Sequence, residues 1–324
     1  MKPSAEIREK VKALTDKLEA GVKEVFESER YMIYLKAMSK FHQYSFGNVL
    51  LILMQCPEAS MVAGFHTWKK QFGRTVKKGE HGIQIIAPTQ RSKLVKQDRL
   101  DPDTQQPIIG ADGLPEKEPG FVSYQSFRVT YVFDVSQTEG KELPSYGVDE
   151  LTGDVPSFDA MFSAIEALSP VPVEYRPAAN SKGCYNHLGQ KIYINEGMSQ
   201  AQTLKTLIHE TVHAKLHALP VEDGKIIGRP EKDIHTREVE AESIAYVVCQ
   251  HFGIDTSDYS FPYVTGWSSG KELDELKASL ECISKTAAEM IDGIEKTCPE
   301  MAIIPIKPIE KDEETFFHHE AMLR

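Results

Sequence analysis

The stretch TLKTLIHETVHAKLHAL, residues 203–219, contains the pentapeptide His209-Glu210-Thr211-Val212-His213. Around it, large apolar residues recur at the three- and four-residue spacing of one helix face, and no glycine or proline interrupts them before Pro220. This spacing predicts a helix with both histidines on one face. The recurring apolar residues are Leu204, Leu207, Ile208, Val212, Leu216 and Leu219.

The two histidines predict a metal site. Residues four apart on a helix lie about 6 Å apart along its axis, so two imidazoles can reach one ion. Zinc, with Zn–N distances of about 2 Å, fits between His209 and His213. Glu210 can lean toward the open position of the metal and take a proton from water, as the general base of a metallopeptidase does. The alternative is a chance motif with two ordinary surface histidines.

His217 is the nearest candidate for a third ligand, but helix geometry argues against it. It lies two further turns from His209, about 12 Å along the axis. A glycine that ends the helix would bring a third histidine back to the metal, and no glycine stands between His213 and His217. We therefore expect His217 to be a partly exposed helix residue.

A second segment, HTREVEAESIAYVVCQHFG (residues 235–253), also predicts a helix, ended by Gly253. Glu238 and Glu242 are four apart and share a face, with the small Ala241 between them to admit a neighbouring helix. One carboxylate that reaches the metal would complete a His₂Glu set and leave a fourth position for water, as in catalytic zinc sites. The alternative for Glu238, Glu240 and Glu242 is a solvated acidic face.

The order HExxH followed by ExxAE resembles the zincin domain of the ImmA/IrrE family and of ArdC-like antirestriction proteins. The resemblance implies Zn²⁺ as the cofactor and Glu238 as the third ligand. It implies that Glu242 supports the metal ligands from behind. Residues 192–199 also resemble the short strand that precedes the active-site helix in that family.

Composition bounds the class of protein. The chain has 324 residues, enough for two domains, with 41% hydrophobic and 26% charged residues. No apolar run reaches the roughly 18 residues of a membrane span, and the polar N-terminus does not resemble a signal peptide. Five scattered cysteines do not suggest a disulfide framework. We expect a cytoplasmic protein with no membrane partner.

Charge is uneven along the chain. Residues 61–100 hold nine Lys or Arg against two acids, a net charge of +7, whereas the whole chain carries −11. Aromatic residues are interleaved with the cations, as in Phe65-His66-Thr67-Trp68-Lys69-Lys70-Gln71-Phe72. Cations that hold phosphates beside rings that stack on bases are typical of a single-stranded DNA groove. Alternatively, Trp68 and Phe72 form one buried helix face.

Four ordered blocks strengthen the DNA-binding interpretation. Residues 44–51, 62–68, 76–83 and 132–138 resemble the N-terminal single-stranded-DNA-binding domain of ArdC-like proteins. The resemblance implies single-stranded DNA as a partner, without saying which side chains touch it. As DNA-binding residues we predict Trp68, Lys69, Arg74, Lys77 and Lys78.

The predicted fold class is α+β with two domains. We predict an ArdC-like single-stranded-DNA-binding domain over residues 1–140, a linker over 141–155, a zincin-like metallopeptidase domain over 156–296 and a flexible tail over 297–324. In the first domain we expect helices over 4–28 and 30–40 and a strand over 82–87 that Pro88 ends. A polar insertion over 90–120 and a return strand over 121–135 follow.

Three functions remain open at this stage. The first is a mobile-element, antirestriction-type protein that binds single-stranded DNA and carries a zinc metallopeptidase-like site. The second is a regulatory zinc endopeptidase that cleaves a specific protein, such as a repressor. The third is a DNA-binding protein whose metal site is structural. The intact Glu210 argues against the third, because a structural site needs no base.

Overall fold

The computed structural model describes residues 5–26, 28–102, 104–110, 112–143, 155, 157–177, 181–254, 261 and 264–301. The chain is a mixed α+β protein, as predicted. Its helices are α1 (Ala5–Val25), α2 (Ser28–Lys40), α3 (Phe46–Gln55), α4 (Phe65–Lys70), α5 (Phe158–Leu168), α6 (Gln200–Leu216), α7 (Ile234–His251), α8 (Val264–Ser268) and α9 (Leu273–Thr297). The strands are β1 (Val62–Gly64), β2 (Arg74–Val76), β3 (Ile83–Asp98), β4 (Lys117–Asp134), β5 (Thr138–Gly140), β6 (Val173–Arg176), β7 (Gly183–Asn186), β8 (Lys191–Asn195), β9 (Val221–Glu222) and β10 (Lys225–Ile226).

The chain divides into two compact units. Among the described residues, one holds Gln84–Tyr131 and the start of α1, and the other holds Lys17–Ile83 and the chain from Val132 to Met301. This partition does not follow the predicted boundaries 1–140, 141–155, 156–296 and 297–324, which stay a prediction. Most of the predicted linker and nearly all of the predicted tail lie outside the described residues.

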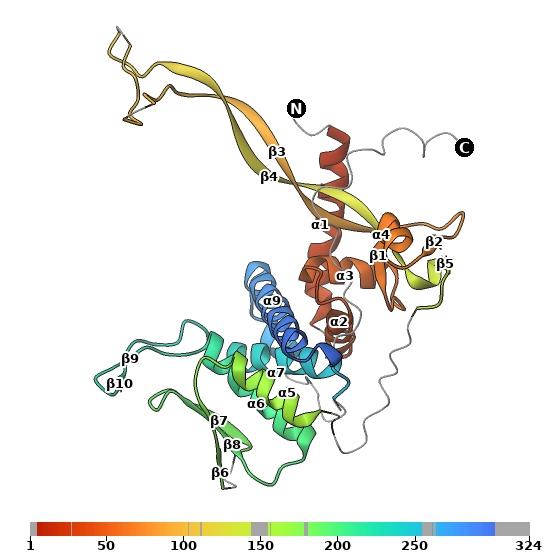
Figure 1. Ribbon diagram of the computed structural model, residues 1–324, viewed down its shortest axis with the longest axis vertical. Helices are drawn as coiled ribbons and strands as arrows, with labels where there is room; N and C mark the ends of the chain where they lie inside the picture. The colour runs from red at the N-terminus through yellow and green to blue at the C-terminus, as the bar shows by residue number, and fades with distance from the viewer. Residues whose placement is uncertain are drawn as a thin grey trace. The chain divides into compact units, whose positions relative to one another are not determined.

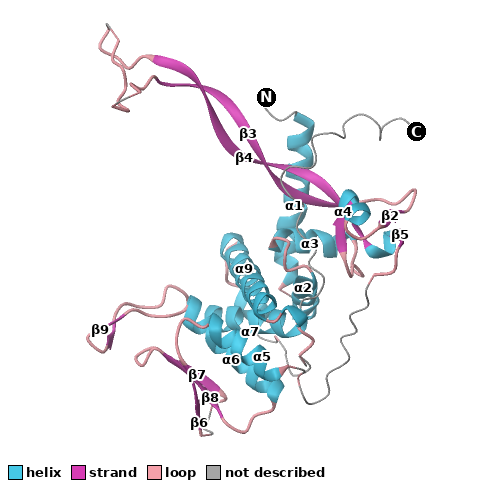
Figure 2. Ribbon diagram, in the orientation of Figure 1, coloured by secondary structure: helices cyan, strands magenta, loops and turns pink. Residues whose placement is uncertain are grey.

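The first unit is dominated by β3 and β4, which pair as a long twisted ribbon (Figure 2). Only the last residues of β4 also pair with β1, so the whole sheet has the order β1-β4-β3. The prediction that Pro88 ends the strand is wrong, because β3 runs on to Asp98. A two-stranded ribbon has two open edges, and a proline on an open edge removes no ladder hydrogen bond. Of the predicted insertion over 90–120, residues 90–98 and 117–120 therefore belong to strands, and only the stretch between Asp98 and Lys117 lies outside β3 and β4.

The second unit has a helical core in which α5, α6, α7 and α9 lie together (Figure 1). Small residues let α6 and α7 approach closely, since Ala214, Ala241 and Ala245 are all buried. Fully buried Leu207 and Ile244 contribute on the order of 2 kcal/mol each through removal of their side chains from water.

Helix α2 packs on α7 in this same core. Tyr31 on α2 is fully buried, and its hydroxyl is hydrogen-bonded to the Ser243 Oγ atom on α7 at 2.8 Å. The N-terminal helices and the helix that bears Glu238 therefore share one hydrophobic core.

Two caps fix where the site helices begin. Ser199 accepts a hydrogen bond from the backbone N–H of Gln202 at the start of α6, and Asp233 accepts one from the N–H of Thr236 at the start of α7. The predicted helices over 203–219 and 235–253 are thus confirmed to within a few residues. No helix in the described ranges is long and apolar enough to cross a membrane.

A three-stranded sheet of order β6-β8-β7 packs beside α6. Strand β8 pairs parallel with β6 and antiparallel with β7. Gly183 on β7 has no room for a side chain: a Cβ atom there would lie 2.6 Å from the Thr206 Cγ2 atom and 2.9 Å from the Tyr193 carbonyl oxygen. This close approach sets β7 directly against the helix of the HExxH motif.

Candidate functional site

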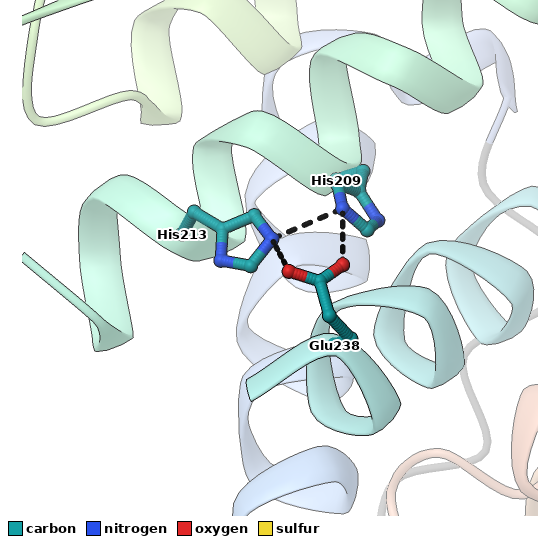
Figure 3. Close-up of side chains that lie close together, drawn as sticks. All are labelled: His209, His213 and Glu238. Atoms are coloured by element: carbon teal, nitrogen blue, oxygen red, sulfur yellow. Dashed lines mark hydrogen bonds and ion pairs between the residues drawn. The ribbon is translucent and has the colours of Figure 1, made fainter. Parts of the chain in front are cut away.

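His209 and His213 project from α6 toward Glu238 on α7, and the three side chains converge on one point (Figure 3). The two Nε2 atoms are 3.0 Å apart. Glu238 places Oε2 3.5 Å from His209 Nε2 and Oε1 3.4 Å from His213 Nε2. Ligand atoms about 2 Å from a tetrahedral ion lie about 3.3 Å from one another, so this donor set fits a zinc-sized ion.

The cluster is open on one side. The Glu238 side chain is 50% exposed, whereas those of His209 and His213 are 19% and 14% exposed. Two imidazoles and one carboxylate leave a tetrahedral ion one free position. The site can therefore hold an ion that water or a substrate still reaches.

Glu242 lies beside the ring nitrogen of His209 that faces away from the cluster. Its Oε2 atom lies 3.2 Å from the Nδ1 atom of His209, and its Oε1 atom lies 3.6 Å from the Lys205 ammonium. A carboxylate on the far nitrogen of a histidine fixes the ring and strengthens its other nitrogen as a ligand. Glu242 can therefore orient His209 without touching the ion.

His213 is supported by a longer chain of groups that the sequence did not reveal. Its Nδ1 atom lies 2.9 Å from the Nδ1 atom of His217, and the Nε2 atom of His217 lies 3.2 Å from Glu240 Oε2. The Lys232 ammonium donates to both Glu240 oxygens, at 2.7 and 2.8 Å. The His217 and Glu240 side chains are 2% and 0% exposed.

One sequence-based expectation, for His217, needs correction, and one alternative, for Glu240, is excluded. His217 is buried rather than partly exposed, because α6 ends at Leu216 and His217 caps it with non-helical backbone angles. Glu240 is not part of a solvated acidic face, because α7 turns it toward His217 and Lys232. The four-residue spacing from His213 to His217 is the one sequence feature that indicates contact between these two rings. It points to a ring that supports His213 rather than to a third metal ligand.

Glu210 lies on the side of α6 that faces β7. It is nearly buried, and its Oε2 atom accepts a hydrogen bond from the Tyr185 backbone N–H at 2.7 Å. Its Oε1 atom has no hydrogen-bond partner among the described residues. One oxygen is thus fixed and the other is free to accept a proton from water.

The charges in the cluster favour a cation. Burial alone would lower the pKa of His209, but hydrogen bonds to Glu238 and Glu242 and the charge of Glu210 outweigh it and raise that pKa to about 9. Hydrogen bonds from His209 and His213 hold the pKa of Glu238 well below its usual range. The carboxylates therefore stabilise positive charge at the point where a metal ion would bind.

The predicted DNA-binding residues differ in their surroundings. Trp68 is fully buried, and its indole N–H donates to the Phe133 carbonyl at 2.9 Å, so its ring has no free face for a base. The placement of Trp68 among the DNA contacts is thus a correction: it belongs to the alternative, a buried helix face. Arg74 uses its guanidinium to hold Thr138 and the Lys141 carbonyl.

The three lysines are the accessible members of the predicted DNA-binding set. Lys69, Lys77 and Lys78 are all exposed. Lys77 also donates to the Ser136 carbonyl at 2.8 Å, whereas no partner of Lys69 or Lys78 is found among the described residues. These cations can meet phosphates.

The ribbon carries exposed aromatic residues outside the predicted DNA-binding set of Trp68, Lys69, Arg74, Lys77 and Lys78. The Arg99 N–H donates to the Glu116 carbonyl, and the hydroxyls of Ser92 and Ser123 lie 3.5 Å apart. Both pairs have residue numbers that add to 215, so Leu94 lies opposite Phe121. Because side chains alternate along a strand, one face of the ribbon carries mainly apolar side chains, and the other carries two cations beside a tyrosine. The first face carries Leu94, Lys96, Phe121 and Phe127, and the second carries Arg91, Lys93 and Tyr124.

Exposure of these ribbon side chains is high. Phe121 is 75% exposed, Leu94 59% and Phe127 50%. Exposed rings beside cations suit single-stranded nucleic acid, because bases stack on the rings while phosphates meet the charges. Tyr124 and Phe127 follow the basic stretch in the sequence and are a signal for nucleic-acid binding, but which ribbon side chains are exposed depends on the fold.

Comparison with known proteins gives a partial match. Residues 5–118 match the family model described as the N-terminal domain of anti-restriction factor ArdC. An uncharacterised Bacillus anthracis protein is 29% identical over 335 residues, which cover 93% of this chain and 54% of the relative. The chain thus spans about half the length of that relative.

Two solved structures of the antirestriction protein ArdC from plasmid R388 are similar to this chain. The metal-free structure is 21% identical with a TM-score of 0.43, over 79% of this chain and 86% of that chain. The Mn(II)-bound structure is 21% identical with a TM-score of 0.39, over 80% of this chain and 85% of that chain.

Proposed function

We propose that this chain is an ArdC-like antirestriction protein that binds single-stranded DNA and carries a zinc centre of the metallopeptidase kind. The convergence of His209, His213 and Glu238, together with the charge of Glu210 acting on His209, carries the proposal. The match of residues 5–118 to the N-terminal domain of ArdC supports the antirestriction context.

Zinc is the proposed ion because two imidazoles and one carboxylate form a catalytic zinc set. When bound, zinc would supply Lewis-acid activation of water and of a peptide carbonyl. Glu210 acts as the general base: its free oxygen takes a proton from the attacking water and later gives one to the leaving amine. The Tyr185 N–H holds the other oxygen, so the carboxylate keeps its orientation during both transfers.

Single-stranded DNA is the proposed partner of two surfaces, each described by itself. One is the set of exposed lysines Lys69, Lys77 and Lys78. The other is the ribbon, where Phe121 and Phe127 offer stacking faces. Stacking of a base on a protein ring contributes about 1–3 kcal/mol, so the two rings supply about 2–6 of the roughly 8 kcal/mol that micromolar binding requires, and phosphate contacts must supply the rest.

One variant separates the peptidase and antirestriction roles. Glu210→Gln keeps the size of the side chain and removes the base. We expect zinc to remain bound, measured by elemental analysis, and any protein cleavage to be lost. If protection of DNA from restriction survives in this variant, protection rests on DNA binding and not on cleavage.

His209→Ala/His213→Ala tests the centre itself. Zinc at this centre should be lost while single-stranded DNA binding is kept. An unchanged zinc content in that double variant, or a purified protein that takes up no zinc, would refute the proposed centre. Loss of protection in Glu210→Gln together with a cleaved cellular protein would instead favour the regulatory endopeptidase.

A further inference from the structure

A second polar cluster lies within the helical unit, built from residues that the metallopeptidase centre does not use. His42 follows the C-terminal end of α2, His251 is the last residue of α7, and Asp292 and Glu295 lie on α9. His42, Asp292 and Glu295 each offer one ligand atom, and the three atoms lie within 4.8 Å of one another. Four residues from three separated stretches of the chain thus meet at one place.

His42 is the unusual member of the cluster. Its side chain is 8% exposed, and neither ring nitrogen has a hydrogen-bond partner among the described residues. The Nε2 atom lies 3.6 Å from the Asp292 Oδ1 atom, which is too long for a hydrogen bond. It is close to the separation of about 3.3 Å between two ligands of one zinc-sized ion. A buried imidazole with no hydrogen-bond partner is unfavourable, and a bound cation would satisfy it.

The charges point the same way. Burial and the neighbouring His251 lower the pKa of His42 to about 4, so its ring is neutral and free to donate a lone pair at neutral pH. Burial and the charge of Glu295 raise the pKa of Asp292. Two carboxylates that repel each other beside a neutral imidazole are a suitable set for a divalent cation.

His251 supports Glu295 from behind. Its Nδ1 atom lies 2.8 Å from the Ser39 carbonyl oxygen, and because a carbonyl only accepts, Nδ1 carries a proton. Its Nε2 atom lies 2.9 Å from Glu295 Oε1. A histidine ring held between a backbone carbonyl and a carboxylate that binds a metal fixes the orientation of that carboxylate, here Glu295.

We propose that His42, Asp292 and Glu295 bind a second divalent transition-metal ion, zinc in the first instance, with His251 holding Glu295 in place. The Asp292 side chain is 66% exposed, which gives the ion a path in from solvent. The ion would fasten the turn after α2 to α9 and, through His251, to the end of α7. It would therefore stabilise the junction of the N-terminal helices with the helix that carries Glu238.

Zinc stoichiometry of the full chain tests the proposal. We expect two zinc ions per chain in the wild type, one in His42→Gln/Asp292→Asn, one in His209→Ala/His213→Ala and none in the combined variant. Glu289→Gln is the matched control, because Glu289 is an exposed carboxylate on the same helix α9. That control should keep both ions.

Each outcome decides one site separately. If His42→Gln/Asp292→Asn still binds two ions, the second site is overturned. It is also overturned if the wild type binds only one ion and His209→Ala/His213→Ala removes that ion. Cobalt titration of the wild type needs no variant: two equivalents with distinct visible spectra support the proposal, and saturation at one equivalent overturns it. The second site does not rest on the proposed function, since it can fill whether or not the first one does.

Discussion

The Nδ1 atom of His213 lies 2.9 Å from the Nδ1 atom of His217. One of the two nitrogens must carry the proton between them. If Nε2 of His213 faces a metal ion, its Nδ1 holds that proton and His217 accepts. His217 then carries its own proton on Nε2 and donates it to Glu240. This single arrangement of protons provides a donor and an acceptor for each contact from His213 through His217 to Glu240.

His217→Phe should therefore weaken zinc binding at the His209–His213–Glu238 centre. Loss of a partner behind a ligating histidine lowers metal affinity about 10- to 100-fold. Competition with a chelator measures this zinc affinity. The measurement uses an Asp292→Asn background, so that only the His209–His213–Glu238 centre binds zinc. Lys215→Ala, an exposed neighbour on α6, is the control and should leave the affinity unchanged. If His217→Phe and Lys215→Ala bind zinc with equal affinity, the His217 ring only fills space and does not support His213.

Gly183→Ala should destabilise the protein. The added methyl group would lie 2.6 Å from Thr206 Cγ2 and 2.9 Å from a backbone oxygen, so β7 must move away from α6. Overpacking of this kind costs about 1–3 kcal/mol in the free energy of unfolding, which urea denaturation measures. Cleavage activity, if present, should fall further than stability explains, because β7 holds Glu210. Gly189→Ala, in a turn with ordinary contacts, should change either quantity little.

Stability of the metal-free protein should fall as the pH drops from about 6.5 to 4. Unfolded His42 takes up a proton below its ordinary pKa of 6.5, whereas the folded ring, with a pKa of about 4, stays neutral. The unfolded state binds more protons across this window, so the free energy of unfolding decreases, by at most about 3 kcal/mol. The raised pKa of Asp292 acts in the opposite direction as the pH falls.

His42→Gln isolates that pH effect. Chemical denaturation in chelator at several pH values should give a wild-type stability that falls more steeply between pH 6.5 and 4 than that of His42→Gln. Asp292→Asn should steepen the fall, because it removes the opposing group. Parallel curves for wild type and His42→Gln would contradict the assignment.

Single-stranded DNA binding should depend on the ribbon rings. Phe121→Ser/Phe127→Ser should lower affinity about 10-fold or more, since each lost stacking contact is worth about 1–3 kcal/mol. Fluorescence anisotropy with a labelled oligonucleotide measures it. Ile33→Ser is the control, because Ile33 is a 54% exposed apolar residue on α2 and does not belong to the ribbon. Unchanged affinity in the ribbon variant would remove the ribbon from the DNA-binding surface.

The lysine surface should act through charge alone. Lys69→Glu/Lys78→Glu should weaken binding for all sequences and flatten the dependence of affinity on salt, because fewer counterions are released. Lys215→Glu/Lys225→Glu, which reverses two exposed lysines on α6 and β10, is the charge-matched control. A salt dependence equal to that of the wild type would contradict this prediction.

The sequence predicted the positions of residues that are fixed by the periodicity of one helix, and it did not predict the positions of residues that depend on where helices end or how they pack. His209 and His213 share a face by helix periodicity alone, and the spacing of the second helix placed Glu238 and Glu242 together. His217 was missed because its direction depends on where α6 stops. His42 was missed because it meets Asp292 only through the packing of α2, α7 and α9. Pro88 was misjudged because an open strand edge tolerates proline.

The hydrogen bond between Tyr31 and Ser243 has a consequence for how such proteins can evolve. Tyr31 belongs to the segment that matches the ArdC N-terminal domain, and Ser243 belongs to the helix of Glu238. A recombination event that exchanged the N-terminal segment between relatives would replace half of a buried contact surface. The two parts are therefore expected to be inherited together, with changes at position 31 compensated at position 243.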